Sequence, residues 1–351
     1  MAFDVFSLRD RVVGEYHDYF ESFVNVRDQE IDSFVRARLH DGELWPTAML
    51  QLNPAYEVGP TLLELASQGI LTHETARFFG PDLRLYRHQQ EALEVARRGE
   101  PYVVSTGTGS GKSLTYLIPI FDQIMRCKPE HPSVRAIIVY PMNALINSQM
   151  EALERFRDGN WPDCPVRFDQ YTGQTKGEDR DRILNDNPHI LLTNYVMLEY
   201  ILIRPYERRL VRQATQELRF LAMDELHVYR GRQGADVAML MRRLRQKAGN
   251  PSLQFIGTSA TLVSKGSRQE RRERIAEAAS TLFGVQVPPD NVVDETLRRM
   301  ATVSAPIAPE KLRAAVEMEP PRATPTSRSG CTSSSPREAA SLPPSSKETA
   351  T

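Results

Sequence analysis

Short apolar runs alternate with segments of helical hydrophobic spacing between residues 81 and 290. The runs have the length of buried strands, and they cover residues 102–105, 136–140, 190–193, 220–223 and 254–258. Between them, apolar residues recur at steps of three and four, and we expect helices such as 236–245 and 270–283. This alternation of strand and helix predicts an α/β fold, in which a parallel sheet carries helices on both faces.

A mainly helical region precedes this α/β domain. Apolar residues follow helical steps from Leu8 to Phe23 and again from Ile31 to Leu39, and a further helix is expected at 61–67. We expect residues 1–80 to form an accessory helical layer packed on the domain 81–290. The alternative is that these helices only bury a face of that domain, because no residue among them carries recognisable chemistry.

The chain changes in character after residue 290. We expect residues 291–319 to form a short helical extension. In residues 320–351, 19 of the 32 residues are Ser, Thr or Pro, and Leu342 is the only large aliphatic side chain. Such a segment buries too little apolar surface to offset the entropy of ordering it, so we expect a disordered tail.

A glycine-rich loop stands between the first apolar run and a helical pattern. Its residues are Thr106, Gly107, Thr108, Gly109, Ser110, Gly111, Lys112 and Ser113. In the context of strand, loop and helix, such a loop turns its backbone N–H groups toward phosphate oxygens. Lys112 would then reach the β- and γ-phosphates of ATP, and the Ser113 hydroxyl would bind Mg²⁺. The usual pattern opens with Gly or Ala where this chain has Thr106, and a turn without a ligand is the alternative.

Two acids follow the fourth apolar run. Asp224 and Glu225 come directly after residues 220–223, and Leu226 and His227 come next. Acids at the carboxyl end of a buried strand lie in the crevice where α/β sheets bind ligands. Downstream of a phosphate-binding loop, we expect Asp224 to hold Mg²⁺ and Glu225 to orient or deprotonate the attacking water. Taken without the loop, the pair would be explained as a solvated strand end.

The segment Asp224-Glu225-Leu226-His227 resembles the DExH box of superfamily 2 helicases and translocases. Residues 86–89 are similar to the family's adenine-reading segment, and this implies that the Gln89 carboxamide contacts the adenine edge. Residues 256–261 resemble the Ser-Ala-Thr element, which implies that Ser259, Ala260 and Thr261 link hydrolysis to domain movement. The resemblance gives His227 a part in the same coupling, and its alternative is a satisfied polar residue at a strand end.

Three more segments resemble the family's strand-contacting motifs, at residues 137–145, 171–173 and 191–198. The resemblance implies that their loops hold a single strand by its phosphates, largely without reading the sequence. The residues expected to make these contacts are Pro141, Asn143, Thr172, Gly173, Thr193 and Asn194. Single-stranded DNA is the partner that we expect, ahead of RNA. Residues 229–234 are similar to a bacterial DExH subgroup found in phage-defence islands and in DNA repair.

The resemblance implies an ATP-dependent helicase or translocase, represented by its first RecA-like P-loop domain. A second RecA-like domain, whose arginines stabilise the transferring phosphoryl group, is not recognisable after residue 265, so we expect very weak turnover from this chain alone. The chain is then either a truncated gene product, which the abrupt Ser- and Pro-rich tail favours, or half of a split motor whose other half is a second polypeptide.

Two other functions stay open. The chain could be a remnant that binds nucleotide and nucleic acid without useful turnover. It could also be a P-loop ATPase that acts on protein, although the 112 residues between Lys112 and Asp224 favour a helicase over that more compact class.

Composition adds limits to these expectations. The chain of 351 residues is 40% hydrophobic and 25% charged, as in ordinary globular proteins, and its net charge of −1 gives no overall basic field. Cys127, Cys164 and Cys331 lack metal-ligand spacing, which favours a reducing compartment. No apolar run approaches the ~20 residues of a membrane span, so we expect a cytoplasmic protein with no membrane partner.

Overall fold

The structure is a computed structural model that describes residues 5–24, 26–40, 55–107, 109–128, 133–207, 210, 217–260 and 267–298. The chain forms two compact units, Met1–Pro54 and Ala55–Thr351, and each is described by itself. Of the calls made from the sequence, most of the extension 291–319, the whole tail 320–351, and site residues Thr108 and Thr261 lie outside the described residues.

The first unit contains two helices, α1 (Val5–Glu21) and α2 (Gln29–His40), where helical spacing predicts them. The Asp28 carboxylate accepts hydrogen bonds from the backbone N–H groups of Glu30 and Ile31 and so begins α2. The Arg36 guanidinium lies 3.6 Å from the Glu21 carboxylate and joins the two helices. Whether this unit forms a layer on the α/β domain stays a prediction.

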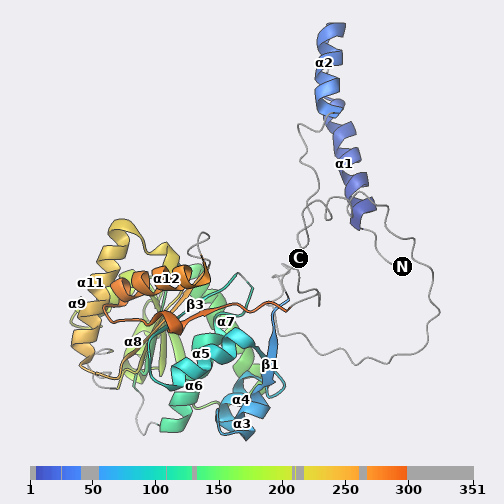
Figure 1. The fold of residues 1–351 in the computed structure, drawn as a ribbon. Coiled ribbons are helices and arrows are strands. Elements are labelled where there is room, and N and C mark those ends of the chain that lie inside the picture. The colour runs from blue at the N-terminus through green and yellow to red at the C-terminus, as the bar shows by residue number, and fades with distance from the viewer. Residues whose placement is uncertain are drawn as a thin grey trace, which may run out of the picture. The chain divides into compact units, whose positions relative to one another are not determined.

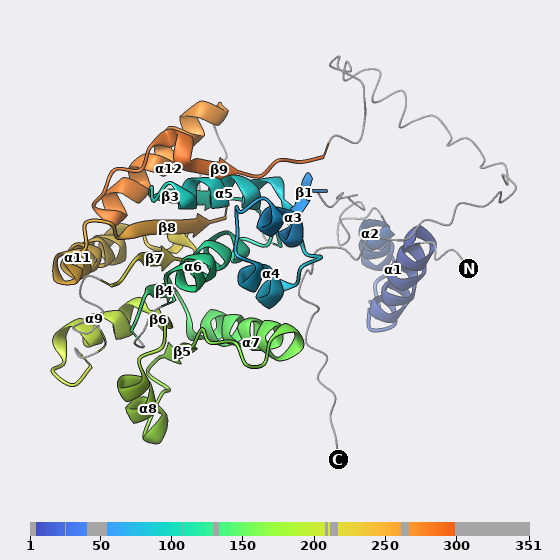
Figure 2. The ribbon, with the colours of Figure 1, turned by 90° about the horizontal axis from the view of Figure 1, so that it is seen from below.

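The second unit is built on a seven-stranded parallel sheet in the order β5-β6-β4-β7-β8-β3-β9 (Figures 1 and 2). The strands are β3 (Tyr102–Ser105), β4 (Ala136–Tyr140), β5 (Phe168–Tyr171), β6 (Ile190–Asn194), β7 (Phe220–Met223), β8 (Gln254–Ser259) and β9 (Val292–Asp294). The five strands expected from apolar runs are confirmed. They are buried on both faces, which is why each reads as a nearly continuous apolar run.

The two edge strands were not expected. In β5 the central residues are Asp169 and Gln170, so no apolar run marks it. Strand β9 lies within the region expected to be a helical extension, and for Val292–Asp294 that expectation is wrong. Val292 and Val293 are buried and pair with β3, so a short edge strand buries more apolar surface here than a surface helix would.

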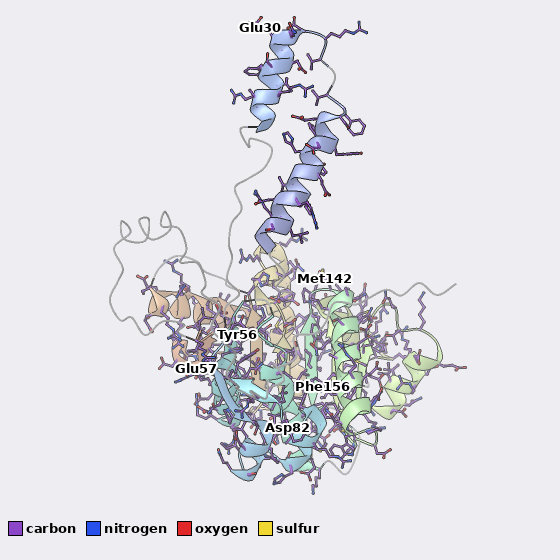
Figure 3. The ribbon with its side chains drawn as sticks, turned by 90° about the vertical axis from the view of Figure 1, so that its right-hand side faces the viewer. Glu30, Tyr56, Glu57, Asp82, Met142 and Phe156 are labelled. Carbon is purple, nitrogen blue, oxygen red and sulfur yellow. The ribbon has the colours of Figure 1, made fainter. Side chains whose placement is uncertain are left out.

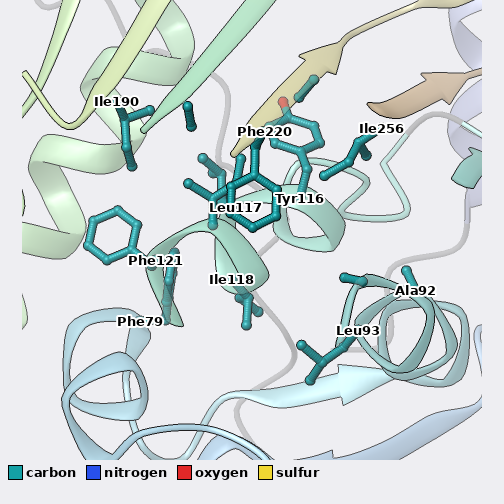
Figure 4. Packing of buried hydrophobic residues seen from close by; sticks show 14 of the residues in the cluster. Phe79, Ala92, Leu93, Tyr116, Leu117, Ile118, Phe121, Ile190, Phe220 and Ile256 are labelled. Atoms are coloured by element: carbon teal, nitrogen blue, oxygen red, sulfur yellow. The ribbon is translucent and has the colours of Figure 1, made fainter. Parts of the chain in front are cut away.

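Successive residues of each strand face opposite layers, as the pleat requires. On one face, residues such as Val103, Ile137 and Leu221 pack with α8 (Glu178–Asp186), α9 (Tyr195–Ile203), α11 (Gly231–Ala248) and α12 (Arg268–Phe283). On the other, Tyr102, Ile138 and Phe220 pack with α5 (Arg87–Arg97), α6 (Leu114–Cys127) and α7 (Asn143–Asn160). Figure 4 shows α6 with its apolar side chains against this face. The prediction of helices on both faces is confirmed.

The boundary expected at residue 80 differs from the structure, because residues from Ala55 onward belong to the α/β unit. Strand β1 (Val58–Thr61) pairs with β2 (Arg84–Tyr86), and α3 (Leu62–Ser67) and α4 (His73–Phe79) follow β1. The Phe78 ring stacks on Phe121 of α6 at a centroid distance of 4.1 Å. The Thr72 N–H, at the start of α4, donates to the Asp122 carboxylate of α6 at 2.6 Å. These helices therefore complete the layer that α6 begins.

None of the described helices is long and apolar enough to cross a membrane.

Candidate nucleotide and nucleic-acid sites

The glycine-rich loop joins β3 to α6 at the carboxyl edge of the sheet. Gly109 and Gly111 adopt left-handed φ values of 79° and 70°. A side chain at Gly111 would be strained at this φ, and its Cβ, 2.5 Å from the Gln89 side-chain nitrogen, would displace the Gln89 carboxamide. The Thr106 and Ser110 hydroxyls are 2.6 Å apart, and the Lys112 ammonium donates to the Thr106 carbonyl at 3.2 Å. Gly or Ala in place of Thr106 could not make this hydroxyl contact with Ser110.

The two acids that follow β7 differ in burial and in backbone conformation. Asp224 is buried, and Glu225 has a left-handed φ of 54°, which is uncommon for a residue with a side chain. After this reversal a short 3₁₀ turn, η1 (Leu226–Val228), begins. The Glu225 carboxylate lies 3.6 Å from the Lys112 ammonium. The glycine-rich loop and the two acids, 112 residues apart in sequence, therefore meet at one place.

The Asp224 carboxylate is held in an environment that disfavours its charge. Burial raises its pKa from 3.8 to about 6; the neighbouring Glu225 charge raises it as well, while Thr258 and Lys112 act in the opposite direction. The Thr258 hydroxyl donates to Asp224 Oδ1 and accepts from the Glu225 N–H at 3.2 Å. A buried carboxylate with little positive charge around it suits a site that gains a cation.

The Ser-Ala-Thr segment at the end of β8 contacts the acids. The Ala260 N–H donates to Glu225 Oε2 at 3.3 Å, and His227 Nδ1 lies 3.1 Å from the same oxygen. Ser259 Oγ is 3.4 Å from His227 Nδ1, so the imidazole does reach this segment. Three of the expected coupling residues, His227, Ser259 and Ala260, are thus brought together.

Gln89 lies beside the loop, but its carboxamide is bonded within the chain. Its Oε1 accepts from the Tyr86 N–H at 2.8 Å, and its Nε2 donates to the Gly111 carbonyl at 2.9 Å. Contact with an adenine would therefore have to share or replace these bonds. Next to it, the buried His88 ring donates from Nε2 to the Ser110 carbonyl at 2.9 Å, and burial lowers its pKa.

Three residues near the nucleotide site were missed from the sequence: His88, Thr258 and Glu295. The Glu295 carboxylate accepts the Gly107 N–H at 2.8 Å, across 188 residues. Thr258 stands inside the recognised Gly-Thr-Ser-Ala-Thr segment, so its position before Ser259 was an available signal. Glu295 follows a strand that the apolar pattern does not predict, and nothing in the sequence marked it.

The loops expected to contact nucleic acid follow β4, β5 and β6, which are neighbours in the sheet. The side chains of Asn143 and Asn194 are in contact, with Asn194 Nδ2 donating to Asn143 Oδ1 at 2.8 Å. Pro141 and Gly173 are accessible, and Met142, beside Pro141, is 59% exposed (Figure 3). These four expected contact residues are available to a strand.

Thr172 and Thr193 are not available in the same way. Thr193 is fully buried, and its hydroxyl donates to the Tyr171 carbonyl at 2.7 Å. Thr172 is 3% exposed, and its hydroxyl accepts from the Gln174 N–H. Threonine hydroxyls at strand ends are often used to hold the following loop, and the sequence alone does not separate that use from a phosphate contact. In the described structure both side chains shape the loops instead.

The order β5-β6-β4-β7-β8-β3-β9 divides the carboxyl edge into two parts. The nucleotide half consists of the loops after β7, β8 and β3, and the nucleic-acid half consists of the loops after β5, β6 and β4. The family model for DEAD/DEAH box helicases matches residues 86–268, which contain both halves. The chain belongs to the DEAD/DEAH box helicase family. The predicted superfamily and the α/β RecA-like fold are confirmed.

Individual relatives agree with this assignment. The chain is 28% identical to Druantia protein DruE of Escherichia coli over 70% of its length, and 35% identical to the uncharacterized ATP-dependent helicase MJ1574 of Methanocaldococcus jannaschii over 51%. It spans 20% and 26% of those two proteins. The crystal structure of the DUF1998 helicase MrfA bound to DNA is similar with a TM-score of 0.55 and 26% identity, covering 69% of this chain and 31% of MrfA.

Proposed function

We propose that this chain is the first motor domain of an ATP-dependent DNA helicase or translocase. The observation that carries the proposal is the convergence of Lys112, Glu225, His227 and the Ala260 N–H within hydrogen-bonding or ion-pairing distance. A phosphate-binding lysine, an acid able to position water and a neighbouring coupling element are what hydrolysis linked to movement needs.

The residues fit ATP and Mg²⁺. The left-handed glycines open the loop backbone toward an anion, and the Lys112 side chain is 10% exposed and faces the DExH acids. Ser113, at the start of α6, and Asp224 would hold the metal, and the raised pKa of Asp224 is consistent with a carboxylate made for a cation. Bound Mg²⁺ would neutralise charge on the β- and γ-phosphates. Gln89 would read the adenine after giving up one of its internal bonds.

Each residue around Glu225 would then have a separate role in ATP hydrolysis. Lys112, released from Glu225, would bind phosphate oxygens. Glu225, relieved of its ion pair, would orient or deprotonate water while His227 and Ala260 hold its second oxygen. Among the described residues, Lys112 is the lysine or arginine whose side chain forms an ion pair with Glu225. A further arginine is needed for rapid turnover, and we place it on a second RecA-like domain, which a separate polypeptide could also supply.

The proposed partner is single-stranded DNA, held by Pro141, Asn143, Gly173 and Asn194. The accessibility of these residues on neighbouring loops supports it, and the MrfA structure shows a similar helicase bound to DNA. The cytoplasmic location and the DNA-repair or phage-defence setting stay predictions.

The test is ATP turnover by the full chain with and without oligo(dT), beside Glu225→Gln. The proposal predicts ATP binding by both proteins and weak turnover that rises with oligo(dT) in the wild type alone. ATP binding with no DNA-dependent turnover would instead support the nucleotide- and nucleic-acid-binding remnant. Stimulation by an unfolded polypeptide and not by DNA would support a P-loop ATPase acting on protein. Loss of ATP binding in the Glu225→Gln protein would contradict the role given to that acid.

A further inference from the structure

A cleft of about 360 Å³ lies at the amino-terminal edge of the sheet, opposite to the edge that carries the nucleotide and nucleic-acid halves. It is formed where β7 and β8 begin, where α5 ends, and by one face of α6. Its apolar lining includes Pro119 and the buried side chains of Leu93 and Phe220, which are labelled in Figure 4. The Gln254 carboxamide donates to the Ala96 carbonyl at 3.2 Å and so holds β8 to α5. The volume is that of a small-molecule site.

Three arginines from three different elements also line this cleft. Arg97 is in the last turn of α5, Arg126 is in the last turn of α6, and Arg219 directly precedes β7. The Arg126 guanidinium is committed, because it donates to the Asp122 carboxylate at 2.7 Å and to the Ile70 carbonyl at 2.9 Å. Within the described part of the chain, the side chains of Arg97 and Arg219 form no hydrogen bond or ion pair. A basic side chain is common in a last helical turn, so Arg219, which precedes a strand, is the more informative of the two.

The acid in the lining of the cleft does not neutralise these two arginines. Asp122 Oδ1 accepts the Thr72 N–H at 2.6 Å and the Thr75 hydroxyl at 3.4 Å, and its Oδ2 accepts from Arg126. Both carboxylate oxygens are therefore occupied by partners within the chain. Three arginines and one aspartate leave two positive charges in the lining, which favours an anionic ligand.

A fourth arginine lies next to Arg219. A small pocket lined by Arg135 and Arg219 adjoins the cleft, and Gln123 and Phe220 line both. The Arg135 guanidinium lies 3.5 Å from the Glu217 carboxylate, but its buried Nε has no hydrogen-bond partner among the described residues. A buried N–H donor without an acceptor is uncommon in a native structure. An anion bound at Arg219 would have this second guanidinium beside it.

We propose that the cleft binds a small phosphate monoester that carries an apolar or aromatic group. The guanidinium groups of Arg97 and Arg219 would each bind the phosphate with a fork of parallel N–H donors. The attached group would cover the apolar lining and gain from its removal from water. The backbone of a nucleic-acid duplex fits this site less well, because its bases are stacked inside the helix and leave the apolar lining uncovered.

The experiment is isothermal titration of phenyl phosphate into the full chain, with AMP-PNP and Mg²⁺ present at saturation so that the glycine-rich loop is filled. One phenyl phosphate should bind per chain. Inorganic phosphate should bind roughly tenfold more weakly, because it covers no apolar surface. Arg219→Ala and Arg97→Ala should each weaken phenyl phosphate binding by roughly tenfold or more, since each removes hydrogen bonds between charged groups.

Two further variants serve as controls. Arg167→Ala removes an exposed arginine directly before β5, at the same edge of the sheet and outside the cleft, and it should leave the affinity unchanged. Arg219→Lys keeps the charge without the fork, so it should lose less affinity than Arg219→Ala. Urea unfolding of each variant shows whether the fold is retained.

Three results would overturn the inference. The first is a wild type that does not bind phenyl phosphate. The second is an equal loss of affinity in Arg167→Ala and Arg219→Ala, which would reflect general positive charge. The third is a loss of duplex DNA affinity in Arg219→Ala without any phenyl phosphate binding, which would assign these arginines to nucleic acid. Binding of AMP-PNP tests the proposed function separately, because that site is at the opposite edge of the sheet.

Discussion

The nucleotide and nucleic-acid halves of the sheet edge differ in how their side chains are held. In the nucleotide half, the Glu225 carboxylate contacts two ionisable groups, Lys112 and His227. In the nucleic-acid half, the expected contact residues are neutral, and Asn143 and Asn194 bond to each other. Charged hydrogen bonds are worth about twice as much as neutral ones. The difference suggests that single residues control nucleotide binding, whereas many small contributions control strand binding.

The strongest test of this contrast exchanges lysine for alanine in each half. Lys112→Ala should weaken ATP binding by roughly 100-fold or more, because a buried phosphate contact with a full charge is lost. Lys176→Ala, at an exposed position near Gly173, should leave ATP affinity unchanged. Isothermal titration with ATP and Mg²⁺ measures both. Similar losses of ATP affinity in the two variants would mean that positive charge anywhere on the surface attracts the nucleotide. The glycine-rich loop would then not be a specific binding site.

A second test uses the raised pKa of Asp224. Between pH 3.8, the ordinary value, and about 6, the folded chain binds a proton that the unfolded chain releases. The free energy of unfolding contributed by Asp224 therefore falls as pH rises through this range, by an amount on the order of 2–3 kcal/mol. Urea unfolding in EDTA at several pH values should show that Asp224→Asn becomes more stable relative to wild type from pH 4 to pH 6. If the free energies of unfolding of the wild type and Asp224→Asn changed with pH in the same way, the raised pKa of Asp224 would be contradicted.

Packing beneath the nucleotide half gives a third, smaller effect. A Cβ on Gly257 of β8 would lie 2.4 Å from Leu226 Cδ1 and 3.0 Å from Phe283 Cζ. Gly257→Ala should therefore lower the free energy of unfolding by about 1–3 kcal/mol and displace the turn that follows Glu225. Gly159→Ala is the matched control, since a Cβ there meets nothing within 4 Å. Urea unfolding measures the free energy of unfolding of both variants. Equal values would show that Leu226 does not pack against Gly257 of β8.

The smallest effect is expected in the nucleic-acid half. Asn194→Ala should weaken oligo(dT) binding by roughly two- to tenfold, the value of one neutral hydrogen bond, with ATP affinity without DNA unchanged. Thr193→Val, which removes a buried hydroxyl, should leave oligo(dT) binding intact. Fluorescence anisotropy measures both affinities. A loss of 100-fold for Asn194→Ala would mean that this half also depends on single residues.

The sequence predicted those parts of the fold in which burial and local pattern agree. The five central strands are buried and mostly apolar, so their runs were visible. Strands β5 and β9 lie at the edges, where polar residues or a length of three leave no pattern. Residues 55–80 were assigned to the preceding region because helical spacing does not reveal that Phe78 packs on Phe121, a contact that depends on the tertiary fold.

The candidate site shows the same limit. Lys112, Asp224 and Glu225 could be predicted because the phosphate-binding loop and the pair of acids are each short, contiguous sequence motifs. Glu295 acts through a side chain that reaches the loop from a distant segment, so spacing carried no signal, whereas His88 stands inside the recognised segment 86–89. For Thr193, the same hydroxyl suits a phosphate contact or a bond to its own backbone, and only the structure showed the second.

The central claim is that ATP and a single strand bind at separate halves of one sheet edge. The most direct measurement titrates fluorescent oligo(dT) into the Glu225→Gln chain, first without nucleotide and then with saturating ATP and Mg²⁺. The account predicts one strand per chain in both conditions, with ATP still bound when the strand is present. Displacement of oligo(dT) by ATP, with affinity falling in proportion to nucleotide concentration, would show that both ligands use the same site and would contradict the account.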